Sequence, residues 1–130
     1  MKIKCIAIKL EKDQLILLGK YGNAKNHFSV SIGKEYIVFG LTFRFEEFGS
    51  GCFVEILSDN NHLIQVPILL FNMIDPRPSK HWEIKQFSEK LITFWPPSMY
   101  KDFYHDDLSE DVPDVVEDFL EVKKKILFEF

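Results

Sequence analysis

The residue types that could bind a metal or carry out acid–base catalysis are scattered along this chain of 130 residues. Its four histidines are His27, His62, His81 and His105. They stand singly, without the HExxH, HxH or His/Cys spacings of metal sites. Only His105 has carboxylates beside it, in His105-Asp106-Asp107, and adjacent residues of a helix point in different directions. We therefore expect no metal site.

The other arrangements that support catalysis are also missing from the sequence. A nucleophile beside a base, or a Gly-rich phosphate loop, would leave a recognisable spacing, and none occurs. The six glycines lie in turns and at one strand position, Gly40, where we expect a bulge or bend of the sheet. Cys5 and Cys52 are far apart, which indicates two buried, reduced thiols. We predict no catalytic residue and no cofactor, and we interpret the chain as a binding protein rather than an enzyme.

One segment combines dense charge with aromatic side chains. From Asp102 to Glu121 there are nine acidic residues and no lysine or arginine, which would repel nucleic acid. Carboxylates around aromatic anchors suit a cationic protein, because complementary charge speeds encounter and buried tyrosines supply binding energy. The alternative is a solvated helix face. The predicted partner-binding residues are Tyr100, Tyr104, Asp106, Asp107, Glu110, Asp111, Asp114, Glu117 and Asp118.

Length and composition predict one ordinary domain over residues 1–130. Hydrophobic residues make up 46% and charged residues 28% of the chain, and its net charge is −4. These values lie outside the range of disordered proteins. The basic N-terminus has no apolar core of a signal peptide, and no window approaches the ~18 apolar residues of a membrane span. We expect a cytoplasmic protein without a membrane partner.

Strands are predicted for most of the first 95 residues. The clearest is residues 35–45, where Ile37, Phe39, Leu41, Phe43 and Phe45 share one face. A turn at residues 49–51 leads to a strand over 52–57, and residues 58–61 close a hairpin onto 62–66. Further strands are expected over residues 1–10, 15–18, 81–87 and 91–95.

After Pro96-Pro97 the apolar residues change to helical spacing. Met99, Tyr100, Phe103 and Tyr104 recur at that spacing, and Asp111 can cap a second helix. The apolar stripe of this second helix is Val112, Val115, Val116, Phe119, Leu120, Val122 and Ile126. The predicted fold class is therefore α+β, an antiparallel twisted sheet or a small SH3-like barrel with a C-terminal helix packed on it.

Four segments resemble a group of small bacterial proteins encoded beside polymorphic toxins. They are residues 34–40 (Lys-Glu-Tyr-Ile-Val-Phe-Gly), residues 54–60, residues 71–75 with Trp82, and residues 95–97 leading to 104–108. The group includes immunity proteins of contact-dependent growth inhibition systems. The similarity is one of pattern, and it covers somewhat over half of the chain.

The resemblance implies a protein that binds one cognate toxin domain, often a nuclease, and blocks its active site without turnover. The family fixes no universal binding residues, so the acidic site above comes from this chain alone. A run of carboxylates would imitate the charge of a nuclease's substrate. The alternative is a non-catalytic adaptor or structural subunit of a larger assembly. The identity of the toxin and the oligomeric state stay open.

Overall fold

The computed structural model describes residues 1–19 and 28–129. Within them lie two antiparallel sheets and three α-helices. The smaller sheet has the order β2 (Glu35–Ile37), β1 (Lys2–Cys5), β6 (Phe71–Asp75). The larger sheet has the order β5 (Leu63–Pro67), β4 (Gly49–Leu57), β3 (Gly40–Glu46), β8 (Leu91–Trp95), β7 (Glu83–Ser88). The helices are α1 (Lys12–Leu18), α2 (Tyr104–Ser109) and α3 (Pro113–Leu127), and two 3₁₀ turns are η2 (Ile68–Leu70) and η3 (Pro97–Tyr100).

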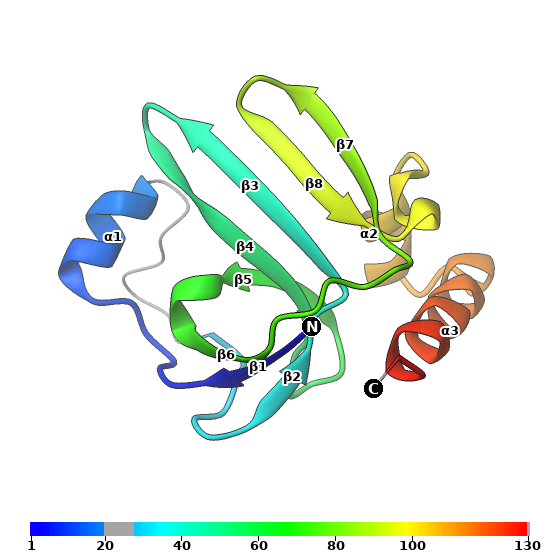
Figure 1. Ribbon diagram of the computed structural model, residues 1–130. Helices are drawn as coiled ribbons and strands as arrows, with labels where there is room; N and C mark the ends of the chain where they lie inside the picture. The colour runs from blue at the N-terminus through cyan, green and yellow to red at the C-terminus, as the bar shows by residue number, and fades with distance from the viewer. Residues whose placement is uncertain (20–27, 130) are drawn as a thin grey trace.

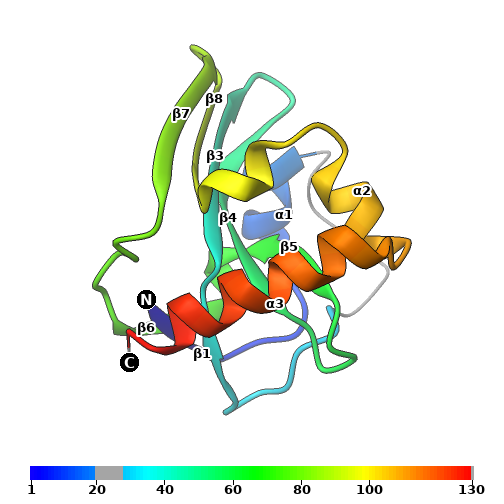
Figure 2. The same cartoon turned by 90° about the vertical axis from the view of Figure 1, so that its right-hand side faces the viewer.

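The elements stack in layers (Figure 1). Figure 2 shows α2 and α3 on one side of the larger sheet, with β1 and β6 towards its other side. Both sheets are open, with β5 and β7 at the edges of the larger one. The predicted α+β class and the C-terminal helix are thus confirmed, and the strands form open twisted sheets instead of a closed SH3-like barrel.

Two apolar cores correspond to these layers. The first joins the smaller sheet, α1 and the larger sheet, and its most enclosed members include Ile3, Leu18 and Ile56, each fully buried. The second lies between the larger sheet and the C-terminal helices, where Phe39 meets Phe119 edge to face at 5.7 Å between ring centroids. α3 therefore depends on the second core for its position.

The strand predicted over residues 35–45 is two strands in different sheets. β2 pairs with β1, whereas β3 pairs with β4 and β8. At the crossing, the Val38 amide donates to Met1 O and the Phe39 amide donates to Glu55 O. Alternation of apolar residues continues through this break because both sheets have a buried face, so the pattern alone did not reveal it.

Gly40 begins β3 directly after this crossing. A Cβ placed there would lie 2.7 Å from Trp95 Cδ1, closer than van der Waals contact permits. β3 pairs with β4 from Gly40 onward without a register shift, so the expected bulge is not found there. The physical reason for glycine at this position is the close approach of the Trp95 indole ring.

The three-stranded run β3-β4-β5 is confirmed, with registers such as Leu41 opposite Val54 and Ile56 opposite Ile64. The turn before β4 was predicted too late, because Gly49, Ser50 and Gly51 are already paired with β3. β8 is confirmed, and β7 begins after Trp82.

Residues 12–18 were predicted to include a strand, and they form α1 instead. Gln14 Oε1 accepts a hydrogen bond from the Glu11 amide at 2.8 Å, half of a capping box. Leu18 is buried against Gly51 and Phe53 of β4. The first predicted strand is real but shorter, because β1 ends at Cys5.

The helical segment after the prolines is divided into three pieces. η3 ends at Tyr100, α2 begins at Tyr104, and Phe103 between them has a left-handed backbone with φ 64°. Asp111 was predicted to cap α3, but Val112 is the N-cap residue and Pro113 opens the helix. Asp111 itself lies in the turn with φ 58°, a conformation that aspartate tolerates better than most residues.

Both cysteines are free thiols. Cys5 is buried as predicted, whereas Cys52 is only partly buried. Burial raises the pKa of the Cys52 thiol to about 11. Cys52 is therefore protonated and unreactive at neutral pH.

Candidate partner-binding surface and its buried charge pair

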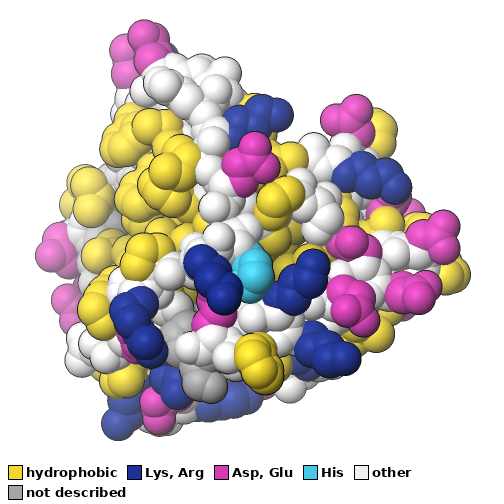
Figure 3. All heavy atoms as spheres, turned by 45° about the vertical axis from the view of Figure 1, so that its right-hand side comes forward, with side chains coloured by type: hydrophobic (Ala, Val, Ile, Leu, Met, Phe, Trp, Pro, Cys, Tyr) yellow, Lys and Arg dark blue, Asp and Glu magenta, His cyan; other side chains and the backbone are white. Residues whose placement is uncertain are grey.

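The acidic residues predicted to bind a partner lie on α2, α3 and the turn between them. Asp106, Glu110, Asp111, Asp114 and Glu117 are exposed, and Asp107 and Asp118 are partly buried. Figure 3 shows acidic side chains gathered at the right of the molecule, where the C-terminal helices lie. These seven residues form what we call the acidic surface. They carry seven formal negative charges and present them from one layer.

Tyr104 does not belong to that surface. Its side chain is 2% exposed and belongs to the second core. Its hydroxyl donates to Asp118 Oδ2 at 2.7 Å, and burial together with this carboxylate raises the pKa of Tyr104. Tyr104 and Asp118 thus hold α2 against α3. The prediction that Tyr104 anchors a partner is wrong, because its ring is buried in the second core.

Tyr100 is also committed to internal contacts. Its hydroxyl donates to Glu83 O at 2.7 Å and lies 2.8 Å from Thr93 Oγ1. Its ring packs at 5.1 Å from the Trp95 ring. Burial is the main cause of its raised pKa. Tyr100 therefore fastens η3 to β7 and β8.

The exposed aromatic residue of the segment is Phe103. It is 74% exposed and sits at the left-handed position that starts α2. A bulky residue with positive φ is uncommon and costs conformational energy. Its backbone turns the chain so that Tyr104 enters the core while Phe103 faces solvent. Among the aromatic residues of this segment, Phe103 is the one placed to contact a partner.

A buried charge pair lies beneath this layer. Glu55, on β4, is 1% exposed, and His105 of α2 brings its Nε2 to 3.0 and 3.2 Å from the two carboxylate oxygens. The imidazole also packs at 4.9 Å from the Trp95 ring. Burial lowers the pKa of His105, but the hydrogen bond and charge of Glu55 outweigh burial and leave that pKa raised. The pair ties α2 to the sheet.

Polar residues accompany Glu55 on the same face of the larger sheet. Gln65 lies opposite Glu55 across β5 and β4, and its Nε2 donates to Thr42 Oγ1 at 3.1 Å. A hollow of about 270 Å³ opens there, lined by Arg44, Gln65 and His105 among others. The sheet thus offers a small hollow of mixed polar and apolar lining next to α2.

A second, larger depression runs between α3 and the β4–β5 hairpin. It consists of two hollows of about 450 and 290 Å³ that share Leu57, Asn61 and Lys123. We call it the α3 groove. Its helix side is formed by Val116, Leu120, Lys123 and Leu127. His105 and Leu108 of α2 close the end nearest the acidic surface.

Metal binding finds no support among residues 1–19 and 28–129, where no three His, Cys, Asp or Glu side chains converge on one point. His105 contacts Glu55 rather than its neighbours Asp106 and Asp107. His81 lies 3.9 Å from Glu129, and His62 is exposed on the groove. His27 falls outside the described residues.

Comparison with models of protein families, with curated proteins and with solved structures gives no match for this chain. Among the helices of the described residues, none has the length and apolar character needed to cross a membrane.

Sequence reasoning did not find Glu55 or the α3 groove. The sequence does contain a sign of the buried Glu55, because Glu55 shares one face of β4 with the apolar residues Phe53 and Leu57. A carboxylate in such a position is seldom buried without a partner. That partner, His105, is 50 residues away, so only the fold identifies it.

Proposed function

We propose that this protein is an immunity protein that binds a cognate toxin domain and neutralises it by covering its active site. The complex is stoichiometric and involves no turnover. A nuclease domain is the preferred toxin, because it exposes lysine and arginine side chains to attract phosphates. The exposed carboxylates of this layer would satisfy those cations in place of the nucleic acid.

The observation that carries this proposal is the acidic surface together with an exposed aromatic residue at the start of α2. Asp106, Glu110 and Glu117 are solvent-exposed, and Phe103, the N-cap residue of α2, is 74% exposed. Binding energy in protein interfaces comes chiefly from aromatic anchors, while surrounding charges accelerate association and select the partner. Phe103 has the side chain for the first role, and the carboxylates have the charge for the second.

The way the chain uses its ionisable groups supports the non-enzymatic interpretation. Glu55 and His105 form the most enclosed acid–base pair described, and Trp95 packs on the imidazole. These contacts hold α2 in place. We therefore assign the pair to positioning of the acidic surface.

A co-expression experiment tests the proposal. The protein is produced with the C-terminal toxin domain encoded by the neighbouring gene, and growth rescue and co-elution are measured. A one-to-one complex with rescue supports an immunity protein. If neither a complex nor growth rescue is observed, the proposal is refuted.

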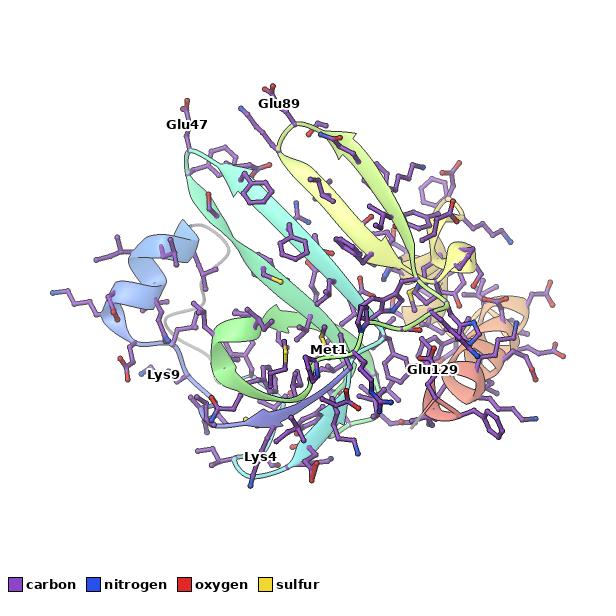
Figure 4. The ribbon with its side chains drawn as sticks, in the orientation of Figure 1. Met1, Lys4, Lys9, Glu47, Glu89 and Glu129 are labelled. Atoms are coloured by element: carbon purple, nitrogen blue, oxygen red, sulfur yellow. The ribbon has the colours of Figure 1, made fainter. Side chains whose placement is uncertain are left out.

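A matched pair of charge-reversal variants then tests the surface. The test variant carries Asp106→Lys and Glu110→Lys. The control carries Glu47→Lys and Glu89→Lys, whose side chains project from the tips of the β3–β4 and β7–β8 hairpins (Figure 4). We expect loss of rescue for the test variant alone, with both circular dichroism spectra unchanged. Full rescue by the test variant would show that the acidic surface is not the interface.

The adaptor alternative has one observation in its favour. Apolar side chains of the β3–β4 and β7–β8 hairpins are exposed, namely Phe45 (52%), Phe48 (53%), Ile84 (65%) and Phe87 (49%). Clusters of exposed apolar residues mark interaction sites. An adaptor would co-purify with a housekeeping complex in cells that lack the toxin gene, whereas an immunity protein would not.

A further inference from the structure

α3 carries two apolar stripes instead of one. The first, Val115, Phe119 and Ile126, is buried in the second core. The second contains Val116, Leu120 and Leu127, at spacings of four and seven residues. Leu120 is 56% exposed and Leu127 is 41% exposed. A helix that only covers a sheet needs one stripe, so the second is available for another contact.

The second stripe forms one wall of the α3 groove. The opposite wall is the β4–β5 hairpin, which contributes Leu57, Leu63 and Ile64. From Val116 to Leu127 the groove follows α3 for about 16 Å at 1.5 Å per residue. This length accommodates about five residues of extended chain. Its shape therefore suits a peptide segment better than a compact small molecule.

The charges along the groove are unequal at its two ends. Asp111 lines the end at the α2–α3 turn, and the exposed Glu110 precedes it in the chain. Lys123 lies about 10 Å further along α3 than Val116. At the Lys123 end, Asp59 accepts hydrogen bonds from Lys34 Nζ at 2.9 Å and from the Tyr36 hydroxyl at 2.8 Å. Lys34 and Asp59 are therefore paired with each other at that end. Asp111 is the carboxylate that lines the α2–α3 end.

The groove wall is held in shape before any partner arrives. Asp59 also accepts from Ser31 Oγ, and these donors, Ser31 first, lower the pKa of Asp59 to about 2. Asp59 therefore stays ionised over the physiological range. A preformed wall reduces the ordering cost of binding.

We propose that the α3 groove binds one segment of the partner protein, with a large apolar side chain between Leu63 and Leu120 and an arginine or lysine beside Asp111. The apolar side chain matches the walls, and the cation matches the carboxylates at the α2–α3 turn. This proposal rests on the proposed function, because it identifies the toxin segment that the acidic surface attracts.

Blocked pentapeptides provide probes that do not require the toxin. The first contains one leucine followed by one arginine among alanines; two matched peptides replace arginine with glutamate or leucine with serine. Each is titrated into ¹⁵N-labelled protein, and amide shifts of Leu63, Asp111 and Leu120 are followed. We expect saturable shifts with the leucine–arginine peptide, with a Kd of about 1 mM, and weaker binding of both matched peptides.

Variants of the protein locate the two contacts. Asp111→Asn removes the charge while keeping a residue that tolerates positive φ, and it is expected to weaken binding about fivefold, the size of an exposed ion pair. Leu120→Ser should weaken binding of the leucine–arginine peptide. The expected affinity is that of the unaltered protein for the peptide in which serine replaces leucine. Glu121→Gln is the control, because Glu121 is exposed and adjacent but does not line the groove.

The outcomes separate this proposal from the proposed function. Saturable, Asp111-dependent binding of the leucine–arginine peptide supports the groove whether or not a toxin is rescued. Absence of saturable shifts, or equal binding of the glutamate peptide, overturns the groove proposal. In that case growth rescue by the unaltered protein would leave the immunity function standing on the acidic surface alone.

Discussion

Breaking the Glu55–His105 pair should loosen α2 from the larger sheet. In His105→Leu, the Glu55 carboxylate, which is 1% exposed in the unaltered protein, loses the hydrogen bonds from Nε2. Removing one partner of a fully buried ion pair costs about 3–5 kcal/mol, and leaving one buried polar group unsatisfied costs about 1–3 kcal/mol. The His105 side chain is 39% exposed, so water replaces part of the contact. We expect a loss of about 2 kcal/mol.

The same pair should make stability depend on pH. The pKa of His105 is raised in the folded protein, above the value of about 6.5 in the unfolded chain. Its contribution is therefore fully present below about pH 6.5 and disappears as pH rises through the folded pKa. Within that window the folded state binds more protons, so stability falls with pH, at up to about 1.4 kcal/mol per pH unit for one group.

Chemical denaturation, followed by tryptophan fluorescence, measures both effects. The experiments cover about pH 5.5 to 9, a range that spans the titration of histidine. Trp95 is a suitable reporter because it contacts His105. Glu55→Gln is the matched variant, since it keeps the shape of the side chain and removes its charge. The stability of the unaltered protein minus that of Glu55→Gln should fall as pH rises. Parallel curves, or a His105 pKa at or below about 6.5 by NMR, would refute this reasoning.

Three further substitutions test the contacts that position the site. Tyr104→Phe should cost about 1 kcal/mol, because Asp118 loses one hydrogen bond, and should leave growth rescue intact; lost rescue in a folded variant would return Tyr104 to the interface. Phe119→Ala should cost about 3–5 kcal/mol in urea unfolding, since the ring fills the second core against Phe39; a cost under about 1 kcal/mol would contradict that packing. Gly40→Ala should cost about 1–3 kcal/mol and change Trp95 fluorescence, because the new methyl meets the indole; an unchanged spectrum would show that the ring has room.

The parts of the fold that sequence reasoning predicted are those set by local rules. β4 and β5 follow from turn residues between two alternating runs, and α3 follows from helical spacing with Pro113 at its start. β8 is a short apolar run that ends at two prolines. In each case the residues that determine the element lie inside it or at its ends.

The parts that were missed depend on contacts far along the chain. The break at Val38 and Phe39 is fixed by hydrogen bonds to Met1 and Glu55, neither of which the alternating pattern contains. α1 was interpreted as a strand because four consecutive apolar residues suit either structure. Its capping residues, Glu11 and Gln14, were the local evidence that could have decided the question.

The predicted site was divided by a backbone conformation that sequence does not specify. Helical spacing grouped Tyr100, Phe103 and Tyr104 on one continuous helix. The left-handed Phe103 ends that continuity, which turns Tyr104 inward and Phe103 outward. The acidic residues were less affected, because a charged residue stays at the surface whichever way the helix is rotated.

The acidic layer is mounted on the sheet through a small number of specific contacts. His105 holds α2 to Glu55, Tyr104 joins α2 to Asp118 of α3, and Phe119 fixes α3 to Phe39. Like charges concentrated on two adjacent helices repel each other and oppose this packing. Asp106, Asp107 and Asp114 lie in the first turns of their helices, where the helix dipole stabilises acidic side chains. Glu110, Asp111 and Glu117 lie outside those first turns and have no such benefit. We propose that this excess of carboxylates, which the Glu55–His105 pair holds against the sheet, serves to bind a cationic partner.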